Sequence, residues 1–288
     1  MAITIIKAED RLKAKPKINI AIFGTSGSGK TTQARTLDPK KTLFVDLEAG
    51  TLAIQDWAGD VLDVRKVAIE LNVHPWEVAK AIAVWIGGPD PADTDGSYSA
   101  ASYANICAAF GDPASPEKYD TVFVDSITVA SRMAFQWSQK QPAAFSEKTG
   151  KPDNRGAYGL LGQEMIRWIT HLQHASKSII VVGILDSTKD DLNRWTHAPQ
   201  IEGGKTGREL PGIFDQVLTL ASMKTPTGED YRAFICWQQN DWGFPAKDRS
   251  GRLNMVEPPD LGALIHKIHT GKRIDQKVIT TIPATTAA

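Results

Sequence analysis

The sequence predicts an α/β fold built on a largely parallel central sheet. Two observations lead to this prediction: apolar runs of strand length recur between stretches of helix length, and the runs are continuous rather than alternating in polarity. Strands that are covered by helices on both faces have this continuous pattern. The runs are residues 18–23, 42–47, 121–125 and 178–185.

Helices are expected between these strands, and a hairpin is expected after them. Residues 161–172 and 78–86 repeat large apolar side chains at helical spacing, and Pro75 suits the first turn of the second helix. We interpret both rows as core. Residues 215–221 and 231–238 predict two strands joined by a tight turn, hence an antiparallel hairpin at the end of the sheet. A short helix over residues 261–268 follows.

Length and composition indicate one large domain with short additions. The chain has 288 residues, of which 42% are hydrophobic, enough for a single substantial core. We expect a strand and linker in residues 1–16, the main domain in residues 17–272 and a flexible tail in residues 273–288. Three polar stretches, residues 87–96, 139–156 and 188–212, are predicted to be long loops.

Charge and cysteine content exclude several classes of protein. Lys plus Arg and Asp plus Glu both number 33, so no overall field attracts nucleic acid or an anionic membrane, and any DNA contact must be local. The two cysteines lack the spacing of a zinc site. There is neither a signal peptide nor an apolar run that could span a bilayer. We therefore expect a cytoplasmic protein without a membrane partner.

A glycine-rich motif directly follows the first apolar run. It has the form G-x-x-x-x-G-K-S/T, in which backbone N–H groups surround phosphates, the lysine reaches the β- and γ-phosphates, and the hydroxyl coordinates Mg²⁺. ATP and Mg²⁺ are the predicted cofactors. The predicted nucleotide-binding residues are Gly24, Thr25, Ser26, Gly27, Ser28, Gly29, Lys30, Thr31 and Thr32.

Two further strands should bring carboxylates to the same edge of the sheet. Asp125 ends the run 121–125 and is the predicted partner of Thr31 in holding the metal. Glu48 follows the run 42–47 and could orient or deprotonate the water that attacks the γ-phosphate, with Asp46 deeper in the strand. An N-cap or a solvated loop acid is the alternative interpretation of Glu48.

The order of the site residues resembles that of the RecA-like P-loop ATPases, and among them that of the phage nucleotide-binding proteins of the single-strand annealing class. These residues are Lys30, Glu48, Asp125 and Ser126. The resemblance implies ATP hydrolysis, single-stranded DNA binding, a homo-oligomer with ATP at subunit interfaces, and a single-strand DNA-binding protein as a further partner. It also implies a polar γ-phosphate sensor where this chain has Ile184 and Leu185, so Asp186 or Ser187 would have to replace it.

The segment 246–251 resembles the Lys-x-Arg-x-Gly element that hexameric helicases insert into a neighbour's ATP site. Lys247 and Arg249 would then act in trans, and a solvated basic turn is the alternative. The resemblance also implies that the loops 139–156 and 188–212 hold DNA, through cations and an aromatic ring. Ordinary solvated loops are the alternative, because acidic residues dilute the positive charge of both segments. The residues proposed for this contact are Lys148, Lys151, Arg155, Arg194, Trp195, Lys205 and Arg208.

The sequence leaves two other functions open. One is a nucleotide-dependent switch that hydrolyses ATP poorly and regulates a protein partner, which the zero net charge and the apolar sensor position favour. The other is a small-molecule kinase, because the same phosphate loop serves such enzymes, although no arginine-rich lid is evident. Residues 3–6 could also add as a strand to a neighbour's sheet or complete their own.

Overall fold

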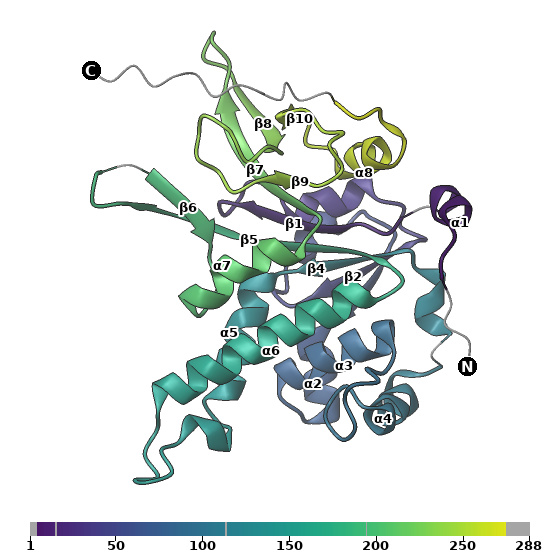
Figure 1. Cartoon of the computed structure of the whole chain (residues 1–288), viewed down its shortest axis with the longest axis vertical. Helices are drawn as coiled ribbons and strands as arrows, with labels where there is room; N and C mark the ends of the chain where they lie inside the picture. Colours follow the sequence, from purple (N-terminus) through teal and green to yellow (C-terminus); the bar gives the residue numbers. More distant parts are fainter. Residues whose placement is uncertain (1–4, 15, 113, 194, 275–288) are drawn as a thin grey trace.

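The computed structural model describes residues 5–14, 16–112, 114–193 and 195–274. Its centre is a sheet with the strand order β10-β8-β7-β1-β5-β4-β2-β3 (Figure 1). Strands β7, β1, β5, β4, β2 and β3 run parallel to one another, whereas β8 pairs antiparallel with β7 and β10 pairs antiparallel with β8. The strands on this path are β1 Asn19–Gly24, β2 Thr42–Asp46, β3 Asp60–Asp63, β4 Thr121–Asp125, β5 Ser178–Lys189, β7 Gln216–Lys224, β8 Asp230–Ile235 and β10 Val256–Glu257.

This topology confirms the predicted α/β core, a mostly parallel central sheet flanked by helices with an antiparallel hairpin at its end. Strands β1, β2 and β4 lie within one residue of their predicted bounds because their apolar runs are buried throughout. The β7–β8 hairpin is also where it was expected, and Figure 1 shows it extending beyond the rest of the sheet. Its register pairs Thr219 with Ile235 and Lys224 with Asp230.

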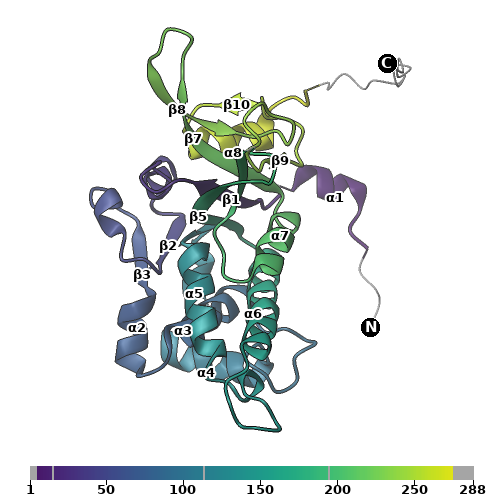
Figure 2. The ribbon, with the colours of Figure 1, turned by 90° about the vertical axis from the view of Figure 1, so that its left-hand side faces the viewer.

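Helices cover both faces of the sheet, and alternate strand residues face the two layers. Ala21 and Phe23 of β1 point to one core, whereas Ile20 and Ile22 point to the other. Figures 1 and 2 show α3, α5 and α6 on one face and α8 on the opposite face. The α-helices are α1 Ala8–Lys13, α2 Val64–Leu71, α3 Pro75–Gly87, α4 Ala100–Phe110, α5 Ile127–Ser138, α6 Asn154–His174, α7 Gly204–Ile213 and α8 Leu261–Thr270, and the 3₁₀ turns are η1 Thr31–Thr36, η2 Thr51–Ile54, η3 Ser115–Lys118 and η4 Pro142–Ala144.

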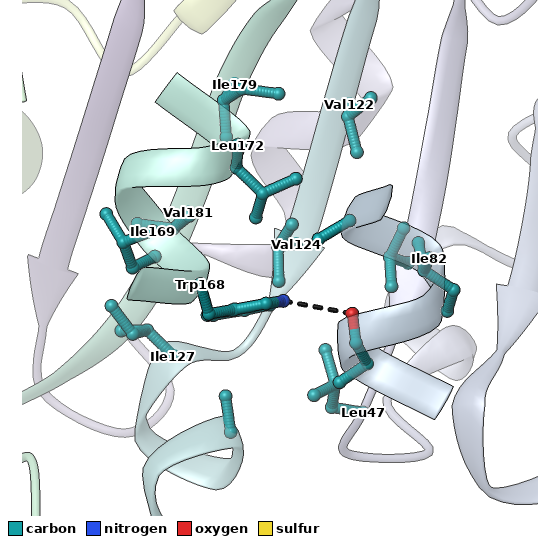
Figure 3. Close-up of a cluster of buried hydrophobic side chains, with 14 of the residues drawn as sticks. Leu47, Ile82, Val122, Val124, Ile127, Trp168, Ile169, Leu172, Ile179 and Val181 are labelled. Atoms are coloured by element: carbon teal, nitrogen blue, oxygen red, sulfur yellow. Dashed lines mark hydrogen bonds between the residues drawn. The ribbon is translucent and has the colours of Figure 1, made fainter. Parts of the chain in front are cut away.

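The larger core confirms that the two predicted helical rows are structural. Trp168 of α6 lies in contact with α3, and its indole N–H donates to the carbonyl oxygen of Ala79 at 3.0 Å (Figure 3). Ile82 of α3 and Leu172 of α6 pack against the same strands. The indole therefore buries a large apolar surface without leaving its polar group unpaired.

Three local predictions need correction, in whole or in their bounds. Residues 188–212 are not a loop, since β5 continues to Lys189, pairs with the antiparallel strand β6 Trp195–Pro199, and is followed by α7. Residues 139–153 form the predicted loop, with the single turn η4 and an isolated bridge between Phe145 and Pro152, and only the last three residues of the predicted stretch belong to α6. Ile5 and Ile6 are not in a strand, and α1 follows them, while the other half of the predicted strand lies outside the described residues.

Candidate functional site

The glycine-rich segment forms a tight loop at the carboxyl end of β1. The N–H of Ser28 donates to the carbonyl oxygen of Thr25 at 3.2 Å. Gly27 and Gly29 have φ values of +77° and +96°, a conformation in which a side chain is strained. A Cβ at Gly24 would lie 2.6 Å from the carbonyl oxygen of Leu220 on β7. The motif glycines are therefore required by backbone geometry as well as by space.

The loop leads into the 3₁₀ turn η1, although helices were expected between the strands, and Thr32 lies in its first turn. This short turn is anchored to the start of α8. The side-chain carbonyl of Gln33 accepts from the N–H of Leu261 at 3.1 Å, and the hydroxyl of Thr36 accepts from Gly262 at 3.0 Å. The end of the phosphate loop is thus fixed by the other helical layer.

The predicted metal residues are in contact. The hydroxyl of Thr31 donates to Oδ2 of Asp125 at 2.6 Å, although 94 positions separate the two residues. Burial raises the pKa of Asp125 to about 6, and the nearby carboxylates of Glu48 and Asp46 add to the shift, whereas the Thr31 hydrogen bond and Lys30 oppose it. A buried carboxylate whose charged form is disfavoured in this way would gain from a divalent ion beside it.

A hydroxyl and a carboxylate are the hard oxygen ligands that suit Mg²⁺. Among the described residues, no group of three His, Cys, Asp or Glu side chains could hold a metal by itself. A magnesium ion at Thr31 and Asp125 would thus need water and phosphate oxygens to complete its coordination, as nucleotide sites provide. The donor set fits magnesium that arrives with a nucleotide.

Lys30 lies folded over the phosphate loop. Its Nζ donates to the carbonyl oxygens of Gly24 at 3.0 Å and Thr25 at 2.9 Å. Burial lowers the pKa of Lys30, and the carboxylates of Asp125 and Glu48 oppose this shift. The ammonium group therefore stands between the loop and the acidic edge, where a phosphate could replace its two carbonyl partners.

Asp46 and Glu48 occupy different positions at the end of β2. Asp46 is buried and pairs in register with Asp125. Its Oδ1 accepts from the N–H groups of Glu48, Ala49 and Gly50 at 3.0, 2.8 and 3.4 Å. Burial raises the pKa of Asp46, while these backbone hydrogen bonds oppose the shift. Asp46 thus fixes the turn that carries Glu48, a role that the sequence did not reveal.

Glu48 is exposed at the same edge and contacts the residue after Asp125. The hydroxyl of Ser126 donates to Oε1 of Glu48 and also accepts from the N–H of Val129 as the N-cap of α5. This interaction joins Glu48 to Ser126, and Lys30 lies near enough to Asp125 and Glu48 for both carboxylates to oppose the lowering of its pKa by burial. Glu48 is an oriented, solvent-accessible carboxylate close to the threonine–aspartate pair.

Lys247 and Arg249 lie near the amino ends of the parallel strands, whereas the phosphate loop of the same chain lies at their carboxyl ends. Strand β9 Lys247–Asp248 pairs with the start of β7, and the guanidinium of Arg249 binds Oδ1 of Asp215 at 2.8 Å. The other oxygen of Asp215 accepts from the N–H of Asn19 at 3.1 Å. Asn19 and Gly24 begin and end β1, about 16 Å apart at the usual rise of a strand. Arg249 therefore cannot reach its own loop.

Lys247 has a structural role in this chain. Its Nζ donates to the carbonyl oxygens of Phe214, Gly212 and Pro211 at 2.7, 3.2 and 3.4 Å, beside the end of α7. Burial lowers its pKa, as does neighbouring Arg249, whereas Asp215 opposes the shift. Of the two cations, Arg249 is the more accessible.

The segments proposed for DNA lie apart on the molecule. Figure 1 shows the 139–153 segment at the far tip of α6 and the β5–β6 hairpin beside the sheet, with α7 between them. Lys148, Lys151, Arg155 and Arg208 are exposed. Trp195 is 60% exposed on β6, and Nζ of Lys189 lies 5.1 Å from its ring centroid. Arg194 and the side chain of Lys205 lie outside the described part of the chain.

The strand expected to carry the γ-phosphate sensor has an apolar residue at the level of the loop. Ile184 pairs in register with Gly24. The two proposed replacements lie further along β5: Asp186 is exposed, and Ser187 is hydrogen-bonded to Nδ1 of His197 at 2.8 Å. The N–H of Gln200 donates to the carbonyl oxygen of Ile184 at 2.8 Å, so the chain directly after β6 returns a polar residue to this level, which the sequence did not reveal.

The fold and the site define a class, namely a P-loop protein in which a phosphate-binding motif, a threonine–aspartate pair and an exposed glutamate meet at one edge of a mainly parallel sheet. A family model described as an AAA domain matches residues 16–250, which is most of the chain. The chain therefore belongs to this AAA-domain family. No curated protein matches the sequence.

Two solved structures share weak similarity with the chain. One is the flagellar accessory protein FlaH from Methanocaldococcus jannaschii, with 8% identity and a TM-score of 0.35 over 83% of this chain and 87% of that one. The other is a prototypical ATPase from the type III secretion system of pathogenic bacteria, with 16% identity and a TM-score of 0.36 over 71% of this chain and 51% of that one. This chain therefore covers about half of the secretion ATPase. Among the described residues, no helix combines the length and the apolarity needed to cross a bilayer.

Proposed function

We propose that the chain binds Mg²⁺-ATP at the loop 24–32 and hydrolyses its terminal phosphate. The observation that carries this proposal is the 2.6 Å contact between Thr31 and Asp125, which joins the phosphate loop to a buried carboxylate on a different strand. Membership of the AAA-domain family supports it. An ordinary glycine-rich turn would have no reason to place its threonine against a distant acid.

Each residue of the site has a role in this proposal. The N–H groups of the loop and Nζ of Lys30 bind phosphate oxygens, and Thr31 with Asp125 would hold the magnesium ion. The ion would supply neutralisation of charge on the β- and γ-phosphates. Glu48, held by Asp46 and Ser126, orients water for in-line attack and accepts its proton.

The proposal includes self-assembly, with ATP at the interface between subunits. Arg249 supports this part because it lies at the edge of the sheet away from its own loop and remains accessible despite its contact with Asp215. It would act as an arginine finger in a neighbouring subunit, and Lys247 would stand beside it. Hydrolysis would then depend on contact between two copies of the chain.

The proposal further includes single-stranded DNA as a partner, in a phage recombination or replication role. The exposed Trp195 and the neighbouring Lys189 provide a stacking surface with an adjacent cation, the combination that non-specific single-strand binding uses. The exposed cations of the 139–153 segment would contact phosphates. The second candidate function, a nucleotide switch, is favoured by the apolar Ile184 at the level of Gly24.

The test is the ATPase rate with and without single-stranded DNA, for the parent, Lys30→Ala, Glu48→Gln, Arg249→Ala and Trp195→Ala. We expect DNA to stimulate the parent and Lys30→Ala and Glu48→Gln to be nearly inactive, with losses of about a hundredfold or more. Trp195→Ala should hydrolyse ATP at the parent's basal rate and lose DNA stimulation. Arg249→Ala should regain activity when mixed with Glu48→Gln, because each subunit supplies what its neighbour lacks.

Other outcomes separate the alternatives. A barely detectable rate that DNA does not change, with intact ATP binding, would favour the switch. Transfer of phosphate to a small acceptor would favour a kinase. Failure of the two variants to restore activity in mixtures would leave Arg249 without a role in trans, and an active Lys30→Ala protein would contradict the site itself.

A further inference from the structure

Arg232 lies beside the phosphate loop, although it is distant from it in sequence. It belongs to β8 and pairs in register with Ser222 of β7. Strand β7 runs parallel to β1 and reaches Gly24, where the carbonyl oxygen of Leu220 closes one side of the loop. The β7–β8 hairpin therefore continues past the loop and brings a side chain of β8 over it.

The guanidinium of Arg232 is held only weakly in this position. Its Nη2 lies 3.5 Å from the carbonyl oxygen of Gly27, at the outer limit of a hydrogen bond. Its Nη1 lies 3.0 Å from the place that a Cβ on Gly29 would occupy. Gly29 thus leaves room for the guanidinium as well as adopting a positive φ. A side chain that rests against two loop glycines can move to a ligand in the loop at small cost.

Arg232 also lacks a carboxylate partner within the described residues. In this respect it differs from Arg249, which binds Asp215, and from Lys224 of the same hairpin, which binds Asp230 at 3.0 Å. A guanidinium offers five N–H donors in a planar fork that matches the oxygens of a phosphate. An unpaired arginine over a phosphate-binding loop has the chemistry of a phosphate ligand.

We propose that Arg232 donates hydrogen bonds to the phosphate chain of the nucleotide bound in the loop of its own subunit. This inference rests on the proposed function of the loop. It assigns the site a second guanidinium, which acts in cis and needs no neighbour, in contrast to the trans role proposed for Arg249. Nucleotide affinity would then depend on Arg232 even in an isolated subunit.

The test is a titration of Mg²⁺-ATP and Mg²⁺-ADP into the parent, Arg232→Ala, Arg232→Lys and Lys224→Ala. The loss of charge-assisted hydrogen bonds in Arg232→Ala should weaken ATP binding about tenfold or more. Arg232→Lys should lose less, because it keeps the charge without the fork. Lys224→Ala removes the same charge from the same hairpin and should bind as the parent does. Apo melting temperatures should match, since Arg232 is exposed.

Mixing experiments distinguish a contact in cis from one in trans. Lys30→Ala subunits retain Arg232 but cannot bind nucleotide, so adding them to Arg232→Ala should not restore affinity if Arg232 acts in cis. Restoration would overturn the proposal, as would parental affinity in Arg232→Ala alongside lost affinity in Lys30→Ala. A matching fall in apo stability would also overturn a direct phosphate contact. A parent that binds no nucleotide would instead contradict the proposed function.

Discussion

At the scale of single residues, the site is a compact set of opposed charges and short hydrogen bonds. Lys30, Thr31, Asp125 and Glu48 come from three segments of the chain and meet at the carboxyl ends of β1, β4 and β2. The glycine-rich motif and the positions of the two acids at the ends of apolar runs predicted this meeting, because parallel strands end at one edge of a sheet. The hydrogen bonds of Asp46 and the position of Arg232 beside the loop could not be predicted. The first depend on the turn after β2, and the second depends on how far the β7–β8 hairpin extends.

The raised pKa of Asp125 predicts a pH dependence of magnesium-dependent nucleotide binding. The carboxylate is ionised and able to coordinate a cation above its pKa of about 6, and it is protonated below that value. Affinity should therefore fall as the pH is lowered from 7.5 to 5, by about tenfold for this group at pH 5. Isothermal titration of Mg²⁺-ATP at several pH values would measure the change.

Asp125→Asn is the matched control for this titration. Its residual pH dependence reports the protonation of the nucleotide itself, so the difference between parent and variant belongs to Asp125. If the two proteins showed parallel pH profiles between pH 5 and 7.5, the carboxylate would not be a metal ligand.

At the scale of elements, the sequence predicted the strands that are buried on both faces. It missed the helix and the strand end whose structure depends on contacts with neighbouring elements. Strands β1, β2 and β4 are continuous apolar runs, so their bounds were readable. Helix α7 has Gly204, Gly207 and Gly212 as well as Pro211, a composition typical of a loop, and its contact with α6 overrides these propensities. The outer part of β5 is stabilised by β6 and carries polar residues, so it also looked like a loop.

Helix α8 provides a test of how the second layer supports the loop. The side chain of Asp260 is its N-cap and accepts from the N–H of Ala263 at 2.9 Å, next to the two bonds that η1 makes with this helix. Asp260→Ala should lower the free energy of unfolding by about 1 kcal/mol. Urea denaturation followed by circular dichroism would measure the loss.

Asp260→Asn is the appropriate control, because asparagine is an equally good N-cap. It should retain most of the stability that the alanine variant loses. Equal unfolding midpoints for parent and Asp260→Ala would show that the start of α8 is held by its packing rather than by its cap.

At the scale of the whole molecule, the sheet separates the chemistry into distinct regions. The phosphate loop and its acids occupy the carboxyl edge, and Arg249 occupies the amino edge about 16 Å away along β1. The proposed DNA segments lie at the tip of α6 and on the β5–β6 hairpin (Figure 1). Under the proposed function, a single copy would hold both a nucleotide site and, in Arg249, a residue for the nucleotide site of another copy. Assembly would then couple the two.

The central claim is that one magnesium ion joins the phosphate loop to Asp125 when nucleotide binds. The most direct measurement is ATP affinity with Mg²⁺ and with excess EDTA, for the parent, Asp125→Ala and Thr31→Ala. We predict that the parent binds ATP about tenfold or more tightly with magnesium than without it, and that both variants lose this difference while keeping the weaker, metal-free affinity. Equal enhancement by magnesium in all three proteins, or no ATP affinity in the parent, would contradict the account.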